Sequence, residues 1–235
     1  MSTAEQSTPP PAPPRRLPSP DETRTVPDQF VDAFAITDPR LIHRHKHRRE
    51  AHALARNDER WEGIYVVSAD PNNEHHFLCA ELMAVFIAVR HLVGGGFVFG
   101  GGNISDRVEG WTKNYRIPDV AVYLATNPAK DCGTHWCGVP DLAVEILSEG
   151  DLARKKLGFY ARVGTREVVI IDRDTRALEL YRLTDDRLKL VGVSTPDRSD
   201  ALASQVLPLS LRLVPGEGRP TLELARLDGQ QTWRI

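Results

Sequence analysis

The sequence predicts an α/β or α+β protein built on a central mixed β-sheet flanked by helices. Short β-branched and aromatic runs recur along the chain, and such runs are typical of strands. One of them, residues 142–147, is followed by a helical segment and a second strand-like run, which is the order of a parallel βαβ crossover. The other runs follow one another as in hairpins. One crossover among hairpins predicts a mixed sheet and argues against a doubly wound nucleotide-binding fold.

The composition is that of an ordinary globular protein and excludes a strongly basic one. The chain is 41% hydrophobic and 26% charged, and its 30 Lys and Arg against 32 Asp and Glu give a formal charge of −2. Histone-like and polybasic membrane-binding proteins have a large basic excess, which is missing here. Three cysteines are too few for a disulfide scaffold, and the first residues lack a signal-peptide pattern. The longest apolar run is shorter than the roughly 20 residues that cross a bilayer. We therefore expect a cytoplasmic protein without a membrane span.

Changes in composition predict three regions. Residues 1–27 hold eight of the 17 prolines and are expected to form a disordered tail. Residues 28–60 are charged and compatible with a helix, and they contain the basic run 43–49, in which histidines alternate with arginine and lysine. Such a run is most often a solvated helix face, although it could also contact a phosphate backbone or a metal ion. Residues 61–235 are expected to form the folded domain.

The pattern of apolar residues within this domain predicts two helices and seven strands. Residues 77–93 are apolar on almost every side, which predicts a helix buried against a sheet. Residues 151–163 have one apolar face and end at Gly164, as expected for an amphipathic helix with a glycine cap. The predicted strands are residues 62–67, 97–99, 117–124, 142–147, 168–171, 178–181 and 188–193.

A lysine and two carboxylates are predicted to converge near the crossover. Lys156 lies in the middle of the apolar face of its helix, where an ammonium group needs an anionic partner unless it reaches solvent. Glu145 interrupts an apolar strand, and Asp119 lies near the start of another. Two carboxylates and a backbone carbonyl form an all-oxygen site of the kind that Mg²⁺ prefers, and a lysine can orient or help deprotonate water there. The trio therefore predicts phosphodiester hydrolysis. Taken singly, the two acids could instead be a turn residue and a strand-end surface group.

The order of these residues resembles the Uma-type endonuclease family of the PD-(D/E)xK, restriction-endonuclease-like superfamily. The resemblance covers residues 61–213 and is most specific in the block 118–172. It implies a restriction-endonuclease-like core with a central mixed sheet. It also implies that Asp119 and Glu145 are metal ligands and that the backbone carbonyl of Ile146 is a third.

The position of the lysine departs from the usual superfamily motif. That motif has a lysine two residues after the second acid, where this chain has Leu147, so Lys156 would replace it from the following helix. The resemblance suggests three secondary candidates. Glu81 resembles an extra acid in the long helix, His75 would lie near the cleft or cap that helix, and Tyr160 would cover Lys156 in the core.

The predicted function is that of a metal-dependent endonuclease acting on nucleic acid, DNA in preference to RNA, with Mg²⁺ or Mn²⁺ as cofactor. A homodimer would supply the two sites that cutting a duplex needs. The alternatives are a catalytically inactive nucleic-acid-binding or protein-binding module on the same fold, and a hydrolase of a small phosphorylated molecule. Cys132, His135 and Cys137 have a spacing that could hold zinc, but they lack a clear fourth ligand, and a surface loop is favoured.

Overall fold

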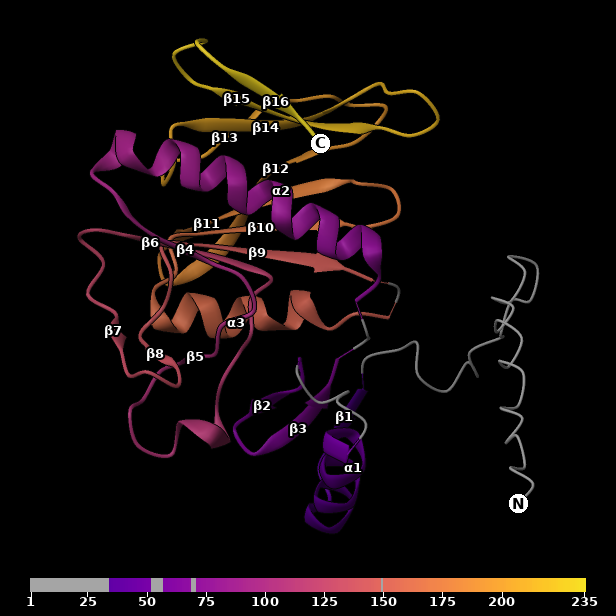
Figure 1. The fold of residues 1–235 in the computed structure, drawn as a ribbon, viewed down its shortest axis with the longest axis vertical. Helices are drawn as coiled ribbons and strands as arrows, with labels where there is room; N and C mark the ends of the chain where they lie inside the picture. The colour runs from indigo at the N-terminus through magenta and orange to yellow at the C-terminus, as the bar shows by residue number, and fades with distance from the viewer. Residues whose placement is uncertain (1–33, 52–56, 69–70, 149) are drawn as a thin grey trace, which may run out of the picture. The chain divides into compact units, whose positions relative to one another are not determined.

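The computed structural model describes residues 34–51, 57–68, 71–148 and 150–235 (Figure 1). The expected disordered tail, residues 1–27, lies outside these ranges. The centre of the fold is a six-stranded sheet in the order β12-β11-β10-β9-β6-β4. Its strands are β4 (Gly96–Phe99), β6 (Val120–Leu124), β9 (Leu142–Leu147), β10 (Glu167–Asp172), β11 (Leu178–Thr184) and β12 (Arg187–Ser194).

The central sheet is mixed, which confirms the predicted fold class. Strands β9 and β10 are parallel and are connected by helix α3 (Ala153–Val163), whereas the other neighbouring pairs are antiparallel. Helix α3 ends at Gly164, which adopts the left-handed conformation (φ 93°) that glycine tolerates best. The crossover was predicted from the order strand, helix, strand, and its two strands are almost entirely apolar, as expected when helices cover both faces of a sheet.

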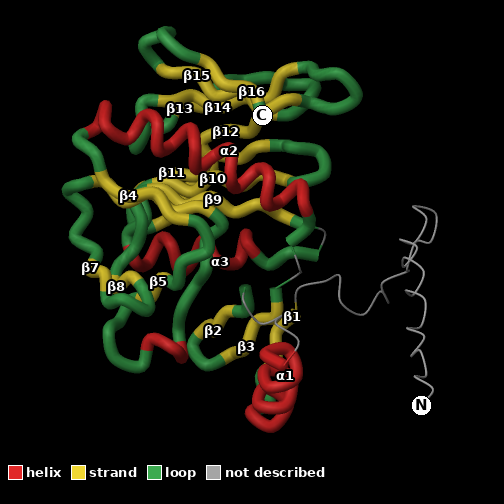
Figure 2. The backbone as a smooth tube through the Cα atoms, in the orientation of Figure 1, coloured by secondary structure: helices red, strands yellow, loops and turns green. Residues whose placement is uncertain are grey.

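Helices α2 (Asn73–Val89) and α3 lie on opposite faces of the central sheet (Figures 1 and 2). Alternate residues of β9 therefore point to different partners. Val144 belongs to the apolar cluster that includes α2, and Ala143 belongs to the cluster that includes α3. The side chain of the next residue, Glu145, is fully buried, so a carboxylate is placed inside the layer between the sheet and α3.

Helix α2 starts earlier than predicted and packs against the central sheet with one side. Its first turn is capped by Asn72, whose side chain accepts a hydrogen bond from the backbone N–H of His75. A 3-10 turn, Arg90–Val93, continues the helix. Five apolar residues face the core, but Phe77 and Ile87 are 46% and 45% exposed. The helix therefore packs against the central sheet as predicted, and its opposite side is apolar but exposed.

The helical stretch Asn73–Val93 is also long and apolar enough to span a membrane by length and composition. Helices that pack against the core of a protein can have the same length and apolar composition. Here Leu78, Leu82 and Phe86 are buried in the same cluster as the central sheet. We therefore treat α2 as a helix of the core.

Three smaller sheets surround the central one. The C-terminal sheet is antiparallel in the order β13-β14-β15-β16, and the other two have the orders β1-β3-β2 and β5-β8-β7. The strands are β1 (Phe34–Ile36), β2 (Glu59–Trp61), β3 (Ile64–Val67), β5 (Ile104–Ser105), β7 (Lys130–Asp131), β8 (Trp136–Cys137), β13 (Leu202–Ala203), β14 (Leu209–Val214), β15 (Thr221–Arg226) and β16 (Thr232–Arg234). The remaining helices are α1 (Pro39–Ala51) and a 3-10 turn (Trp111–Lys113).

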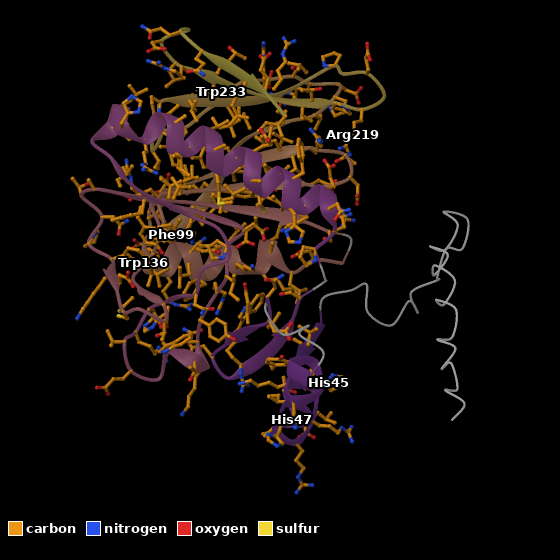
Figure 3. The ribbon with its side chains drawn as sticks, in the orientation of Figure 1. His45, His47, Phe99, Trp136, Arg219 and Trp233 are labelled. Carbon is orange, nitrogen blue, oxygen red and sulfur yellow. The ribbon has the colours of Figure 1, made fainter. Side chains whose placement is uncertain are left out.

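The region before residue 61 contributes more to this fold than its composition suggested. Strand β1 pairs with β3, and β2 forms a hairpin with β3. The predicted strand 62–67 begins only at Ile64, because Glu62 and Gly63 form the hairpin turn with positive φ angles of 48° and 87°. The basic run 43–49 lies on α1, as its helical pattern suggested, and Figure 3 shows His45 and His47 on this helix.

Candidate active site

A pocket of about 300 Å³ lies where β9 ends and β6 begins. The β2–β3 hairpin, the first half of α2 and the start of α3 complete its walls. Five residues selected from the sequence line this pocket, and they come from segments far apart in the chain. These residues are His75, Asp119, Glu145, Ile146 and Lys156.

Lys156 is buried in this pocket between two carboxylates. Its Nζ lies 2.8 Å from Oε2 of Glu145 and 2.7 Å from Oε1 of Glu59. A third acceptor, the carbonyl oxygen of Ile117, lies 3.4 Å from Nζ. All three ammonium hydrogens therefore have an acceptor, which is the condition under which a buried charge is tolerated.

The pKa values of Glu145 and Lys156 are both raised in this cluster, for different reasons. Burial raises the pKa of Glu145 to about 8, because the attraction of Lys156 only partly offsets burial and the repulsion from Asp119 and Glu59. Burial lowers the pKa of Lys156, but the Glu145 and Glu59 carboxylates outweigh it and hold that pKa above its usual value. Lys156 therefore stays an ammonium ion at neutral pH, and it cannot accept a proton from water.

A tyrosine fixes the second oxygen of Glu145. The hydroxyl of Tyr160, one turn after Lys156 on α3, donates to Oε1 of Glu145 at 2.5 Å. Burial and the Glu145 carboxylate raise the pKa of Tyr160 well above its usual value, so the phenol keeps its proton and remains a donor. Tyr160 thus fixes the position of the Glu145 carboxyl group.

Asp119 lies at the junction of the sheet and α2. Its Oδ2 accepts the backbone N–H of Ile146 at 2.6 Å, and its own N–H donates to the carbonyl oxygen of Val144 at 3.0 Å. Its Oδ1 lies 3.0 Å from Nε2 of His75 in the first turn of α2. These contacts fix the carboxylate of Asp119 to β9 and direct it into the pocket that Glu145 also lines.

The structure does not place Glu81 in this pocket. Its side chain is exposed on α2. Glu81 follows His75 by six residues, which is about 240° around a helix, so the two side chains point to different sides. Among the described residues, the carboxylates that line the pocket are Glu59, Asp119, Glu145 and Asp151.

Two residues of the pocket, Glu59 and Cys79, were not predicted from the sequence. Glu59 is buried, accepts the backbone N–H of Ile117 at 2.8 Å and pairs with Lys156, but it precedes the predicted start of the domain. Glu59 and Trp61 are two residues apart on strand β2, so their side chains share a face. This spacing was the signal that could have placed Glu59 beside Trp61. Cys79 follows His75 by four residues, and that helical spacing would have placed both side chains on one face of α2.

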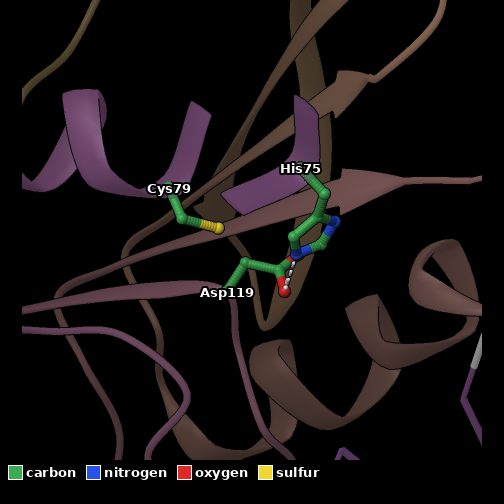
Figure 4. Close-up of side chains that lie close together, drawn as sticks. All are labelled: His75, Cys79 and Asp119. Atoms are coloured by element: carbon green, nitrogen blue, oxygen red, sulfur yellow. Dashed lines mark hydrogen bonds and ion pairs between the residues drawn. The ribbon is translucent and has the colours of Figure 1, made fainter. Parts of the chain in front are cut away.

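The zinc site considered for residues 132–137 is not formed among the described residues. Both ring nitrogens of His135 have other partners, namely the hydroxyl of Thr134 and the carbonyl oxygen of Arg107, each at 3.1 Å. The Cys132 thiol lies 3.8 Å from the carbonyl oxygen of Lys130. Within the described ranges, the ligand atoms that converge belong instead to His75, Cys79 and Asp119 (Figure 4).

Comparison with known proteins agrees with the resemblance seen in the sequence. Residues 48–215 match the model of a family described as "Uma2: Putative restriction endonuclease". No curated protein matches this chain. A solved structure from Anabaena variabilis, described as a "putative nuclease belonging to DUF820", is 20% identical with a TM-score of 0.49, and the match covers 63% of this chain and 80% of that chain. Because the family model matches well over half of the chain, the protein belongs to the family described as "Putative restriction endonuclease".

Proposed function

We propose that this protein is a metal-dependent endonuclease that hydrolyses phosphodiester bonds in DNA. The observation that carries the proposal is the buried pairing of Lys156 with Glu145 in a pocket that Asp119 also lines. Two acids and a lysine in one pocket are the groups needed to hold a divalent cation and to stabilise charge on a phosphate. Membership of the family supports nuclease activity in general.

The donor set and the charge of the pocket fit a divalent cation. Four carboxylates and one lysine ammonium line the pocket in the described part of the chain. The raised pKa of Glu145, to about 8, partly reflects the repulsion from Asp119 and Glu59, which a cation would relieve. Carboxylate oxygens of Asp119 and Glu145 and the backbone carbonyl of Ile146 are the hard ligands that Mg²⁺ or Mn²⁺ takes. Such an ion would supply a Lewis acid that polarises the phosphoryl group.

The chain's own residues orient the reacting groups. Because Lys156 stays protonated, we assign it the role of a fixed cation that holds Glu145 and stabilises negative charge on the phosphate electrostatically, and not that of a base. Tyr160 and Glu59 are positioning residues, since the first holds an oxygen of Glu145 and the second holds the ammonium of Lys156. His75 holds the carboxylate of Asp119.

The proposed substrate is DNA, and the exposed basic helix α1 supports a nucleic-acid substrate. Arg44 and Lys46 are exposed on α1 and offer positive charge for a phosphate backbone, with exposed His43 and His47 beside them. A homodimer would provide the two sites required for a double-strand cut. We place the protein in the cytoplasm, because its three cysteines, all within the described residues, are free thiols.

The test is a cleavage assay with matched glutamate variants. Purified protein is incubated with supercoiled plasmid DNA, or with labelled RNA, in Mg²⁺, Mn²⁺ or EDTA. We expect cleavage of DNA with either ion, none in EDTA, and a loss of at least about 100-fold for Glu145→Gln. Glu81→Gln removes an exposed carboxylate of α2 and should cut as well as the parent.

Two results would reject the nuclease proposal. In one, the parent protein cuts no nucleic acid with either ion. In the other, Glu145→Gln cuts as fast as Glu81→Gln. If the parent does not cut, shows no divalent-metal binding by calorimetry and still binds DNA in a salt-sensitive manner, the protein is the non-catalytic binding module considered above.

A further inference from the structure

We propose that His75, Cys79 and Asp119 form a binding site for Zn²⁺ at the α2 wall of the pocket. Each of these side chains offers one ligand atom, and the three atoms lie within 4.8 Å of one another. Figure 4 shows the Cys79 thiol and the His75 ring directed from α2 toward Asp119. A single ion placed among three atoms this close can contact all of them after small side-chain adjustments.

Two of the ligands lie on helix α2, and the third, Asp119, immediately precedes strand β6. His75 and Cys79 are four residues apart on α2, so their side chains lie on one face of the helix. The start of α2 is fixed by the Asn72 cap on the N–H of His75. Asp119 is fixed by its bonds to β9. The site is therefore largely preformed.

The chemistry of the ligands favours zinc over magnesium. The set contains an imidazole nitrogen, a thiol sulfur and a carboxylate oxygen, which is the mixture that Zn²⁺ binds in proteins. Mg²⁺ prefers oxygen ligands. Zn²⁺ binds nitrogen and sulfur ligands more tightly than Mn²⁺ or Fe²⁺ does. Binding forms a bond between zinc and the sulfur of Cys79 and releases the thiol proton to solvent. All three residues line the pocket, so a fourth coordination position would face a substrate.

The imidazole ring of His75 has a single hydrogen-bond partner among the described residues, and that partner is the proposed ligand Asp119. Nε2 lies 3.0 Å from Oδ1 of Asp119, and the other ring nitrogen, Nδ1, is buried without a hydrogen-bond partner among the described residues. No other group therefore fixes which nitrogen carries the proton. An ion between Nε2 and Asp119 would replace one hydrogen bond by contacts to both atoms.

The site has a consequence for catalysis that rests on the proposed function. Asp119 belongs both to this zinc site and to the all-oxygen site proposed for Mg²⁺. The two ions therefore compete for one carboxylate, and Zn²⁺ inhibits Mg²⁺-dependent cleavage. Zinc binding itself does not depend on the protein being a nuclease.

The experiment uses Co²⁺ as a spectroscopic probe for Zn²⁺ in the full chain. A cobalt ion bound to a thiolate gives an intense charge-transfer absorption in the near ultraviolet, and Zn²⁺ should displace it. We expect this absorption in the parent, its loss in Cys79→Ser, and its retention in the double variant Cys132→Ser, Cys137→Ser. His75→Gln should lower the affinity for Zn²⁺, measured by calorimetry, by at least about 10-fold. Even replacing a residue that only hydrogen-bonds a metal ligand typically lowers the metal affinity by about that factor.

Folding is checked separately, and the outcomes are distinct from those of the cleavage assay. Far-ultraviolet circular dichroism and thermal unfolding in EDTA should agree between the parent and Cys79→Ser. The proposal is overturned if the parent shows no thiolate absorption with Co²⁺, or if well-folded Cys79→Ser keeps it. Because these readouts measure binding, their failure leaves the nuclease proposal standing, and an inactive nuclease leaves the zinc site standing.

Discussion

Replacing Lys156 by methionine tests the buried charge cluster, because the substitution keeps the shape of the side chain and removes its charge. The two carboxylates that pair with Lys156, those of Glu145 and Glu59, are almost completely buried. Removing one partner of a buried ion pair typically costs about 3–5 kcal/mol, since a charge is left in the interior without compensation. We expect Lys156→Met to lower the free energy of unfolding by about this amount at pH 8.

The cost of this substitution should increase above about pH 8. In the parent the folded-state pKa of Glu145 is already raised from 4.5 to about 8, and loss of the ammonium raises it further. A carboxyl group whose pKa is raised on folding stabilises the folded state most below its unfolded pKa, and that contribution is lost as the pH rises through the folded pKa. Between about pH 4.5 and pH 8 this loss has the same slope in the parent and in the variant. The destabilisation of Lys156→Met should therefore grow only above about pH 8, where Glu145 ionises in the parent but stays protonated in the variant, by at most about 1.4 kcal/mol per pH unit.

The assay is urea unfolding followed by tryptophan fluorescence at pH 8 and at about pH 9.5. The matched control is Lys155→Met, which removes an exposed ammonium from the same helix and should change the free energy of unfolding by less than about 0.5 kcal/mol. The reasoning is refuted if Lys156→Met costs less than about 1 kcal/mol at pH 8. It is equally refuted if the cost is the same at both pH values.

Three further predictions concern the residues around this cluster. Tyr160→Phe should lower the free energy of unfolding by about 1–3 kcal/mol, because it leaves Oε1 of buried Glu145 without its donor. The control, Tyr123→Phe, removes a buried hydroxyl that has no partner among the described residues and should be neutral or stabilising. Equal effects in thermal or urea unfolding would contradict the role assigned to Tyr160. The affinity for Mg²⁺, measured by calorimetry, should rise about tenfold per pH unit from pH 6 to pH 8 and level off above pH 8, because Glu145 must lose its proton to bind the ion. An affinity that does not change with pH would argue against Glu145 as a ligand. Gly96→Ala should lower the free energy of unfolding by at least about 3 kcal/mol, because a Cβ would collide with the carbonyl oxygen of Tyr123. In the control, Gly95→Ala, the Cβ would point into open space, and the positive φ alone should cost about 1–2 kcal/mol. A similar loss of stability in both variants would show that the close approach at Gly96 is not tight.

The parts of the site that depend on local pattern could be predicted from the sequence. Lys156 interrupts the apolar face of an amphipathic helix, and Glu145 interrupts an apolar strand, so each stands out against its immediate neighbours. The strand and helix are consecutive in one crossover, whose handedness and packing are strongly constrained. The expected meeting of Lys156 and Glu145 follows from that short connection, and the structure places their charged atoms 2.8 Å apart.

The parts that depend on long-range contacts could not be predicted in this way. Glu59 meets Lys156 only because the β2–β3 hairpin packs beside the start of β6, and its local sequence is merely charged. The side of α2 that faces the sheet could not be predicted, because apolar residues such as Phe77 and Ile87 occupy its exposed side and the helix has no polar face to mark its orientation. Without that orientation, Glu81 and His75 on the same helix were equally good candidates, although only His75 reaches the pocket.

A crystal structure of the protein with Mn²⁺, examined by anomalous scattering at the manganese absorption edge, tests the central claim most directly. The account predicts an anomalous peak in the pocket, within coordination distance of the carboxylates of Asp119 and Glu145, with Lys156 Nζ still beside Glu145. A pocket that stays empty at saturating Mn²⁺, or a peak bound by other residues while these two acids make no contact with it, would contradict the account.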